Sequence, residues 1–279
     1  MNSKKTKIII SVILALLIVI VIFVMHNFVG LGAKDIKVAK NFIEKLYSIN
    51  AINKQEDLKS IKYKRVKTLN TKNELIYKTI VTDSFGIDLD KNYNIIGFAN
   101  KELVKVDSEI TVEEAKSIAD QYLSKIYDKE VTFKTIKSDE DAGKLPYYSF
   151  VYLKSKYGYP LYFNEIIVNI NKSTGFLDNY TNSSIQKECK EPILNISKEM
   201  AEIEALDTFV KYHKNGQISN ITELAYADNK SISELCYVVA IKGKDENGAD
   251  ITWKLFVSTE TKEIVNILKY GTEDSVIAN

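Results

Sequence analysis

The chain has 279 residues, of which 45% are hydrophobic and 27% are charged, a balance that is ordinary for a folded protein and excludes a disordered one. Its 38 basic and 37 acidic residues leave a net charge of +1, so no strong field steers a charged partner. Arg65 is the only arginine. Because phosphates and base edges are recognised mainly by arginine, we expect no nucleic-acid partner.

The N-terminal segment is apolar from Ile8 to Met25 except for Ser11, and it reaches the length of a bilayer core when extended to residue 31. Three lysines precede it and orient the N-terminus toward the cytoplasm. We therefore predict a cytoplasmic tail at 1–7, a single transmembrane anchor at 8–31 and an extracytoplasmic body at the cell membrane. The alternative is a cleaved signal peptide, but this apolar core is longer than such a peptide needs and residues 31–33 make a poor cleavage site.

A first, degenerate unit is predicted at 36–105. Asp35 can cap a helix that runs to about Ser48, because apolar residues recur at helical spacing: they are Val38, Ala39, Phe42, Ile43 and Leu46. The period then changes to two, which predicts strands at 61–64, 74–82, 85–89 and 95–99.

The last turn of this unit has the spacing of a calcium loop, with oxygen-bearing side chains at alternate positions: Asp88, Asp90, Asn92 and Asn94. A calcium loop also needs glycine at its sixth position and glutamate at its twelfth, and Tyr93 and Ala99 stand there. A hairpin turn explains the same residues. We therefore expect no metal and no cofactor.

The second unit is predicted at 110–185. Thr111 and Glu114 have the spacing of a capping box at the start of a helix. Small residues at Ala115 and Ala119 allow that helix to lie close to a sheet. Strands are expected at 131–136, 147–153, 161–170 and 176–180, with turns at 156–160 and 172–175.

The third unit is predicted at 196–270. Ser197 caps its helix, and Ala201, Ala205 and Phe209 each lie 86 residues after Ala115, Ala119 and Leu123. Strands are expected at 218–225, 235–242, 251–258 and 264–268, with a turn at 245–248. The predicted fold class is α+β, with an N-terminal transmembrane helix followed by tandem units of one helix packed on an antiparallel sheet of about four strands.

Cys189 and Cys236 have no metal-ligand or redox spacing. In an extracytoplasmic protein they could form one disulfide. The alternative is two separate buried thiols that act as small hydrophobic groups.

Tyrosines cluster along the 147–162 hairpin: Tyr147, Tyr148, Tyr152, Tyr157, Tyr159 and Tyr162. Tyrosines at alternate strand positions can present an amphipathic surface. Our candidate binding residues are Tyr147, Tyr152, Tyr157, Tyr159 and Tyr162. The alternative is core packing on one face and ordinary strand propensity on the other. Tyr157 and Tyr159 flank a glycine, and we expect them to be the exposed pair.

Two segments resemble the PepSY and YcdB/YcdC-type repeats. Ile110–Leu123 is similar to the opening helix of these repeats, and Val168–Gly175 to the strand and turn that close them, with Asn171 in place of the usual Asp. In the third unit, residues 259–263 replace this turn and lack its glycine. The resemblance covers about 110–270, with a weak extension toward residue 36.

The resemblance implies a membrane-anchored, outward-facing module that restrains or scaffolds another protein, such as a secreted or wall-associated peptidase or hydrolase. It supplies no catalytic residues, and His213 is explained by a helix C-terminus, so we expect no enzyme. The layout also resembles the YycH and YycI regulators. The alternative function is therefore accessory regulation of a membrane sensor kinase through the transmembrane helix.

Overall fold

The computed structural model describes residues 33–53, 64–69, 75–101, 109–137, 145–182 and 187–270, and it divides the chain into two compact units, Met1–Leu103 and Val104–Asn279. The division falls between the first and second units expected from the sequence, whereas the second and third lie together in the second compact unit. No helix in the described ranges is long and apolar enough to span a membrane. The expected tail and anchor at 1–31 lie outside these ranges.

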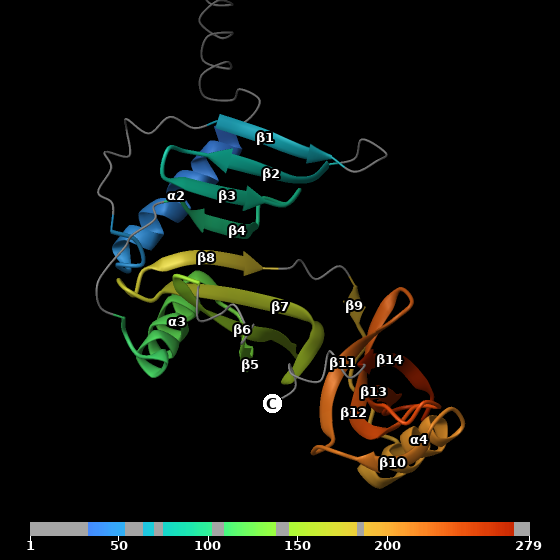
Figure 1. Ribbon diagram of the computed structural model, residues 1–279. Helices are drawn as coiled ribbons and strands as arrows, with labels where there is room; N and C mark the ends of the chain where they lie inside the picture. Colours follow the sequence, from blue (N-terminus) through green and yellow to red (C-terminus); the bar gives the residue numbers. More distant parts are fainter. Residues whose placement is uncertain are drawn as a thin grey trace, which may run out of the picture. The chain divides into compact units, whose positions relative to one another are not determined.

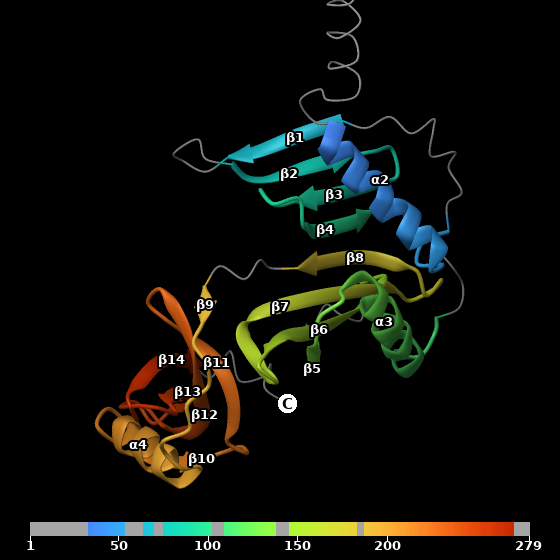
Figure 2. The ribbon, with the colours of Figure 1, turned by 180° about the vertical axis from the view of Figure 1, so that it is seen from behind.

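The first compact unit is one helix on an antiparallel sheet (Figures 1 and 2). Its elements are α2 (Ala33–Ser48), β1 (Lys64–Leu69), β2 (Leu75–Val81), β3 (Phe85–Leu89) and β4 (Ile95–Asn100). The strands pair in chain order. Helix α2 buries the predicted apolar stripe, and its Phe42 ring meets Phe98 of β4 edge-on at 6.0 Å. The degenerate first unit is therefore a helix-on-sheet unit.

Asp35 does not cap α2, because the helix already includes Ala33. It lies in the first turn, only 2% exposed, and its carboxylate accepts a hydrogen bond of 2.8 Å from the Lys78 ammonium on β2. The Lys78 ammonium also lies 4.2 Å from the centroid of the Tyr93 ring. The residue expected to be a cap is thus half of a buried ion pair between helix and sheet.

The second compact unit opens with the same arrangement. Its elements are α3 (Val112–Ile126), β5 (Val131–Ile136), β6 (Tyr147–Lys156), β7 (Tyr159–Asn171) and β8 (Leu177–Asn182), and its strands pair antiparallel in the order β5-β6-β7-β8. The Thr111–Glu114 capping box is confirmed. Helix α3 buries Ala115, Ala119, Tyr122 and Leu123, and its contacts lie with β6 and β7.

The rest of this unit contains β9 (Glu188–Cys189), α4 (Lys198–Val210), β10 (Lys214–Ile218), β11 (Glu223–Asn229), β12 (Ile232–Lys244), β13 (Asp250–Ser258) and β14 (Ile264–Tyr270). Ala201, Ala205 and Phe209 are fully buried, as their 86-residue correspondence predicts. The single strand expected at 218–225 was wrong. Strand β10 ends at Ile218 and strand β11 begins at Glu223, so that range contains the ends of two strands and the residues 219–222 that join them.

The sheet of the second unit is mixed rather than purely antiparallel, which corrects the prediction. Strand β11 pairs in parallel with the start of β7, where Tyr226 lies opposite Leu161, and the two-residue β9 pairs in parallel with β12. Phe163 and Tyr162 of β7 pack against Phe256 of β13. The two helix-on-sheet repeats of this unit therefore share apolar contacts.

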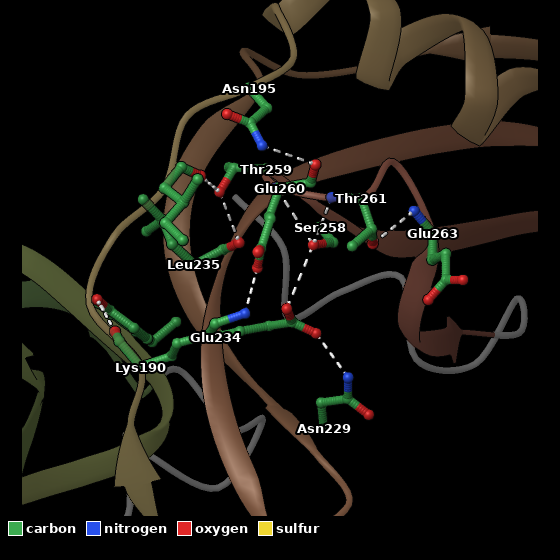
Figure 3. Close-up of polar contacts among 12 residues, drawn as sticks. Lys190, Asn195, Asn229, Glu234, Leu235, Ser258, Thr259, Glu260, Thr261 and Glu263 are labelled. Carbon is green, nitrogen blue, oxygen red and sulfur yellow. Dashed lines mark hydrogen bonds and ion pairs between the residues drawn. The ribbon is translucent and has the colours of Figure 1, made fainter.

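The closing turns of these two repeats have the same construction. The Asn171 Oδ1 accepts hydrogen bonds of 3.0 Å from the amides of Ser173 and Thr174, so asparagine does what the aspartate of the repeat motif would do. In the last repeat, Ser258 Oγ accepts hydrogen bonds from the amides of residues 260 and 261 and donates one to the buried Glu234 carboxylate (Figure 3). Each of these three hydrogen bonds is 3.3 Å long. Lys262 has φ 68°, matching the φ of 70° at Gly175.

This equivalence predicts that removing the glycine from one turn and adding a glycine to the other change stability by different amounts. Gly175→Ala should lower the free energy of unfolding by about 1–2 kcal/mol, because an L side chain is strained at positive φ and its Cβ would lie 3.1 Å from the Ile118 side chain. Lys262→Gly relieves the same strain but makes the unfolded chain more flexible, so it should change stability by less than about 0.5 kcal/mol. Denaturant titration measures both. Equal losses would show that the two turns are not equivalent.

Candidate binding surface

The structure does not gather the candidate tyrosines on one surface. Tyr152 is 2% exposed and donates a 2.8 Å hydrogen bond to Asp120 of α3, whereas Tyr147 lies an odd number of residues away and faces the opposite side of β6. Tyr162 meets Phe256 edge-on at 4.7 Å. Tyr159 packs against the Leu161 cluster. Core packing therefore explains most of this cluster.

Tyr157 is the exposed tyrosine of the hairpin, with 48% of its surface accessible. Lys156 pairs with Tyr159, so the loop between β6 and β7 contains only Tyr157 and Gly158, and both have positive φ (53° and 80°). This is a two-residue turn of the primed type, tighter than the five-residue turn expected. Of the pair expected to be exposed, Tyr157 is exposed and Tyr159 is half-buried.

The disulfide considered between Cys189 and Cys236 is not formed, since both are free thiols. Cys236 belongs to a buried cluster with Ala225 and Phe256, whereas Cys189 packs against a separate cluster around Leu161. Burial raises the pKa of both thiols. They behave as the small hydrophobic groups of the alternative interpretation.

The other sequence candidates have structural roles. The Asp90 carboxylate accepts 2.8 Å hydrogen bonds from the amides of Asn92 and Asn94, which identifies the expected hairpin turn. His213 is not simply a surface residue, because its half-buried ring packs edge-on against Trp253 at 4.8 Å. Within the described ranges, no group of three or more His, Cys, Asp or Glu residues could hold a metal ion.

Lys154 lies on β6 and is 3% exposed. Burial, with the nearby positive charge of Lys129, lowers the pKa of its ammonium from 10.5 to about 8. The unfolded chain keeps this proton up to a higher pH than the folded chain does. The protein should therefore become more stable as the pH rises from about 8 to about 10.5.

To isolate this effect, we compare the wild type with Lys154→Met, in which the other titrating groups are unchanged. The stability difference between the two proteins should shift in favour of the wild type by about 1 kcal/mol between about pH 7.5 and about pH 9. Urea titrations at each pH measure it. A difference that does not change with pH would mean that Lys154 is ordinarily solvated.

The largest departure from a normal surface lies on α4. Its outward face carries Met200, Ile203 and Val210, which are 45%, 57% and 51% exposed. Ile221 is 80% exposed, and its neighbour Thr222 donates a 2.6 Å hydrogen bond to Glu202 of α4, which ties this segment to the helix. We call these four residues the α4 surface.

Helix α3 provides an internal comparison. Positions 86 residues earlier are Glu114, Ser117 and Ser124, all polar and exposed. Two helices with the same buried face thus differ on their outer face, and only α4 is apolar there. The 86-residue offset in the sequence already contains this difference between the two helices, and the prediction based on the tyrosine cluster does not use it. Exposed apolar clusters of this kind mark interaction sites.

Acidic groups border the α4 surface. Glu199 and Asp207 lie one turn to either side of Ile203, both are exposed, and neither forms an ion pair with a described residue. Hydrogen bonds from Ser197 and from the backbone hold the pKa of Glu199 below its usual value, so this carboxylate is charged at neutral pH. The surface is therefore apolar at its centre, with these two carboxylates on either side of Ile203 and the exposed Lys211 next to Val210.

The described chain is thus a tandem of α+β units, each with one helix on a sheet, that carries an apolar surface on its last helix. Residues 70–184 match the family described as the YcdB, YcdC repeated domain, which confirms the resemblance expected from the sequence. The match begins earlier than expected, since it takes in β2 to β4, and it ends before the last repeat.

One solved structure has a similar fold. The C-terminal domain of YpeB from Bacillus megaterium has a TM-score of 0.50 at 15% identity, over 85% of this chain and 96% of that chain. A Clostridium difficile 630 protein described as a lipoprotein has a TM-score of 0.22 at 14% identity, over 61% of this chain and 100% of that chain. This structural match is too weak to show a shared fold. No curated protein matches the chain.

Proposed function

We propose that this protein is an extracytoplasmic, membrane-anchored protein-binding module that restrains or scaffolds a secreted or wall-associated protein, such as a peptidase or hydrolase. The observation that carries the proposal is the α4 surface. Its apolar residues replace the polar residues of α3 while the buried face is kept. The anchor expected at 8–31 and the match to the YcdB, YcdC repeat support the proposed location.

The chemistry of the surface defines the partner. Burying Met200, Ile203 and Val210 favours association through apolar contact. Glu199 and Asp207 favour lysine or arginine around the contact, because complementary charges speed encounter and fix its register. We infer a partner that presents an apolar segment with basic flanks. In this proposal the module acts by occlusion or scaffolding and performs no catalysis.

The test compares two matched substitutions in the full-length protein. Ile203→Glu places a charge in the centre of the α4 surface and should weaken capture of the partner at least about tenfold, whereas Ser117→Glu at the equivalent position of α3 should leave it unchanged. Both sites are exposed, so both variants should keep the wild-type melting temperature. Equal capture by the two variants would contradict the proposal.

A further inference from the structure

The second compact unit contains a polar cavity of about 290 Å³ on the face of the β6–β7–β8 sheet that lies away from α3. The strand registers explain its composition. Ile166, Val168 and Ile170 of β7 are buried on the α3 side, so alternation turns the residues between them to the other face. There Ser149, Asn169 and Asn179 lie in one row across the three strands.

Asn169 is the unusual member of this row. It is only 9% exposed, yet its Oδ1 accepts no hydrogen bond from any part of the chain that the structure describes. A buried carbonyl oxygen without a donor costs about 1–3 kcal/mol. Buried polar atoms almost always have a partner. Asn169 lines the cavity, but its Oδ1 has almost no accessible surface, so a ligand N–H or O–H group reaches this acceptor only when the Asn169 side chain rotates toward the cavity.

The neighbouring groups supply the complementary chemistry. Thr181 donates a 3.1 Å hydrogen bond to the Asn179 Oδ1, which occupies that carbonyl and leaves the amide NH₂ group of Asn179 as a donor. Ile136 and Ile167 provide apolar lining, and Tyr147 provides an aromatic ring. The lining thus combines an acceptor, a donor, an apolar wall and an aromatic face.

We propose that this cavity binds an N-acetylated sugar unit through its acetamido group. The acetamido N–H satisfies Asn169 after its side chain has rotated toward the cavity, the acetamido carbonyl accepts from Asn179, and the methyl group meets the isoleucines. Tyr147 can pack against the sugar ring, and Thr181 can meet a hydroxyl. The volume suits one sugar unit, since it lies at the lower end of ligand pockets.

An extended peptide fits less well. Strand β7 is paired with β6 on one side and with β8 on the other along this row. It therefore has no free edge to which a peptide backbone could add. A peptide would have to bind by side chains alone, and Lys137 is the one charged residue among the described residues that line the cavity.

The test uses the full-length protein in detergent and N,N′-diacetylchitobiose as the probe, with binding followed by calorimetry. We expect saturable binding that Asn169→Leu weakens at least about tenfold, and no binding of cellobiose, which lacks the acetamido groups. Asn169→Leu should keep or raise the melting temperature, because it removes an unpaired buried oxygen.

Matched hydroxyl substitutions control for fold. Thr181→Val inside the cavity should weaken binding, and Thr132→Val on the exposed part of β5 should not. Absence of binding by the wild type would overturn the proposal. Equal binding of cellobiose would overturn the role of the acetamido group, and equal competition by triglycine would reassign the cavity to peptides. None of these outcomes depends on the α4 surface.

Discussion

Replacing Phe209 with alanine should lower the free energy of unfolding of the second compact unit by about 3–5 kcal/mol. The Phe209 ring is fully buried and meets the Trp253 ring edge-on at 5.3 Å. It lies against two glycines, and a Cβ built at Gly243 would come within 2.6 Å of the ring. The two glycines have no side chains of their own that could fill the space that the ring leaves.

The fluorescence of Trp253, the only tryptophan, reports this unfolding during denaturant titration. The neighbouring Val210→Ala should change stability by less than about 0.5 kcal/mol, because Val210 is half exposed. Gly243→Ala should destabilise by about 1–3 kcal/mol through overpacking. The double variant with Gly243→Ala and Phe209→Leu should lose less stability than the sum of the losses in the two single variants. Strict additivity would contradict direct contact between ring and glycine.

Removing Asp35 should destabilise the first compact unit by about 3–5 kcal/mol, since it leaves the Lys78 ammonium buried without its carboxylate. Both side chains are shielded from water, at 3% and 11% exposure, and their charged atoms are 2.8 Å apart. Asp35→Ala should therefore act far more strongly than the loss of an ordinary surface pair.

Two controls define the cause. The exposed pair Lys244–Asp250 provides the first, and Asp250→Ala should cost less than about 1 kcal/mol. The double change Asp35→Leu with Lys78→Met replaces both charges by apolar groups and should recover most of the stability. Hydrogen exchange of the Ile80 and Ile87 amides measures the changes at Asp35 and Lys78 in the first compact unit, and Trp253 fluorescence during denaturant titration measures the effect of Asp250→Ala in the second. A double variant as unstable as Asp35→Ala would mean that Asp35 acts through its other contacts.

Local signals in the sequence predicted most elements. The Thr111–Glu114 capping box, the repeated alanines of α3 and α4, and the exact extent of β3 and β5 all depend on residues close together in the chain. Such features follow from periodicity and backbone geometry alone. The closing turn at residues 171–175 was also predictable, because its asparagine and glycine are required by the turn itself.

The features that the sequence did not predict depend on contacts between residues that are far apart in the chain. The parallel pairing of Tyr226 with Leu161 joins strands 65 positions apart, and alternation within either strand is the same for both directions of pairing. Aspartate is a common residue at the start of a helix, so the sequence suggests that Asp35 is a cap. Only the position of Lys78 on β2 shows that Asp35 is an ion-pair partner. The cavity around Asn169 likewise arises from three strands that no local pattern aligns.

Site-specific photocrosslinking shows whether the α4 surface contacts a different protein. A benzophenone amino acid is placed at position 203 or, as the control, at position 117 of the full-length protein in its native cells. Mass spectrometry then identifies the crosslinked peptides. The account predicts that position 203 captures an apolar, lysine- or arginine-flanked segment of one secreted or wall-associated protein, and that position 117 does not. Peptides from a second copy of this chain, from a sensor kinase, or from the same proteins at both positions would contradict it.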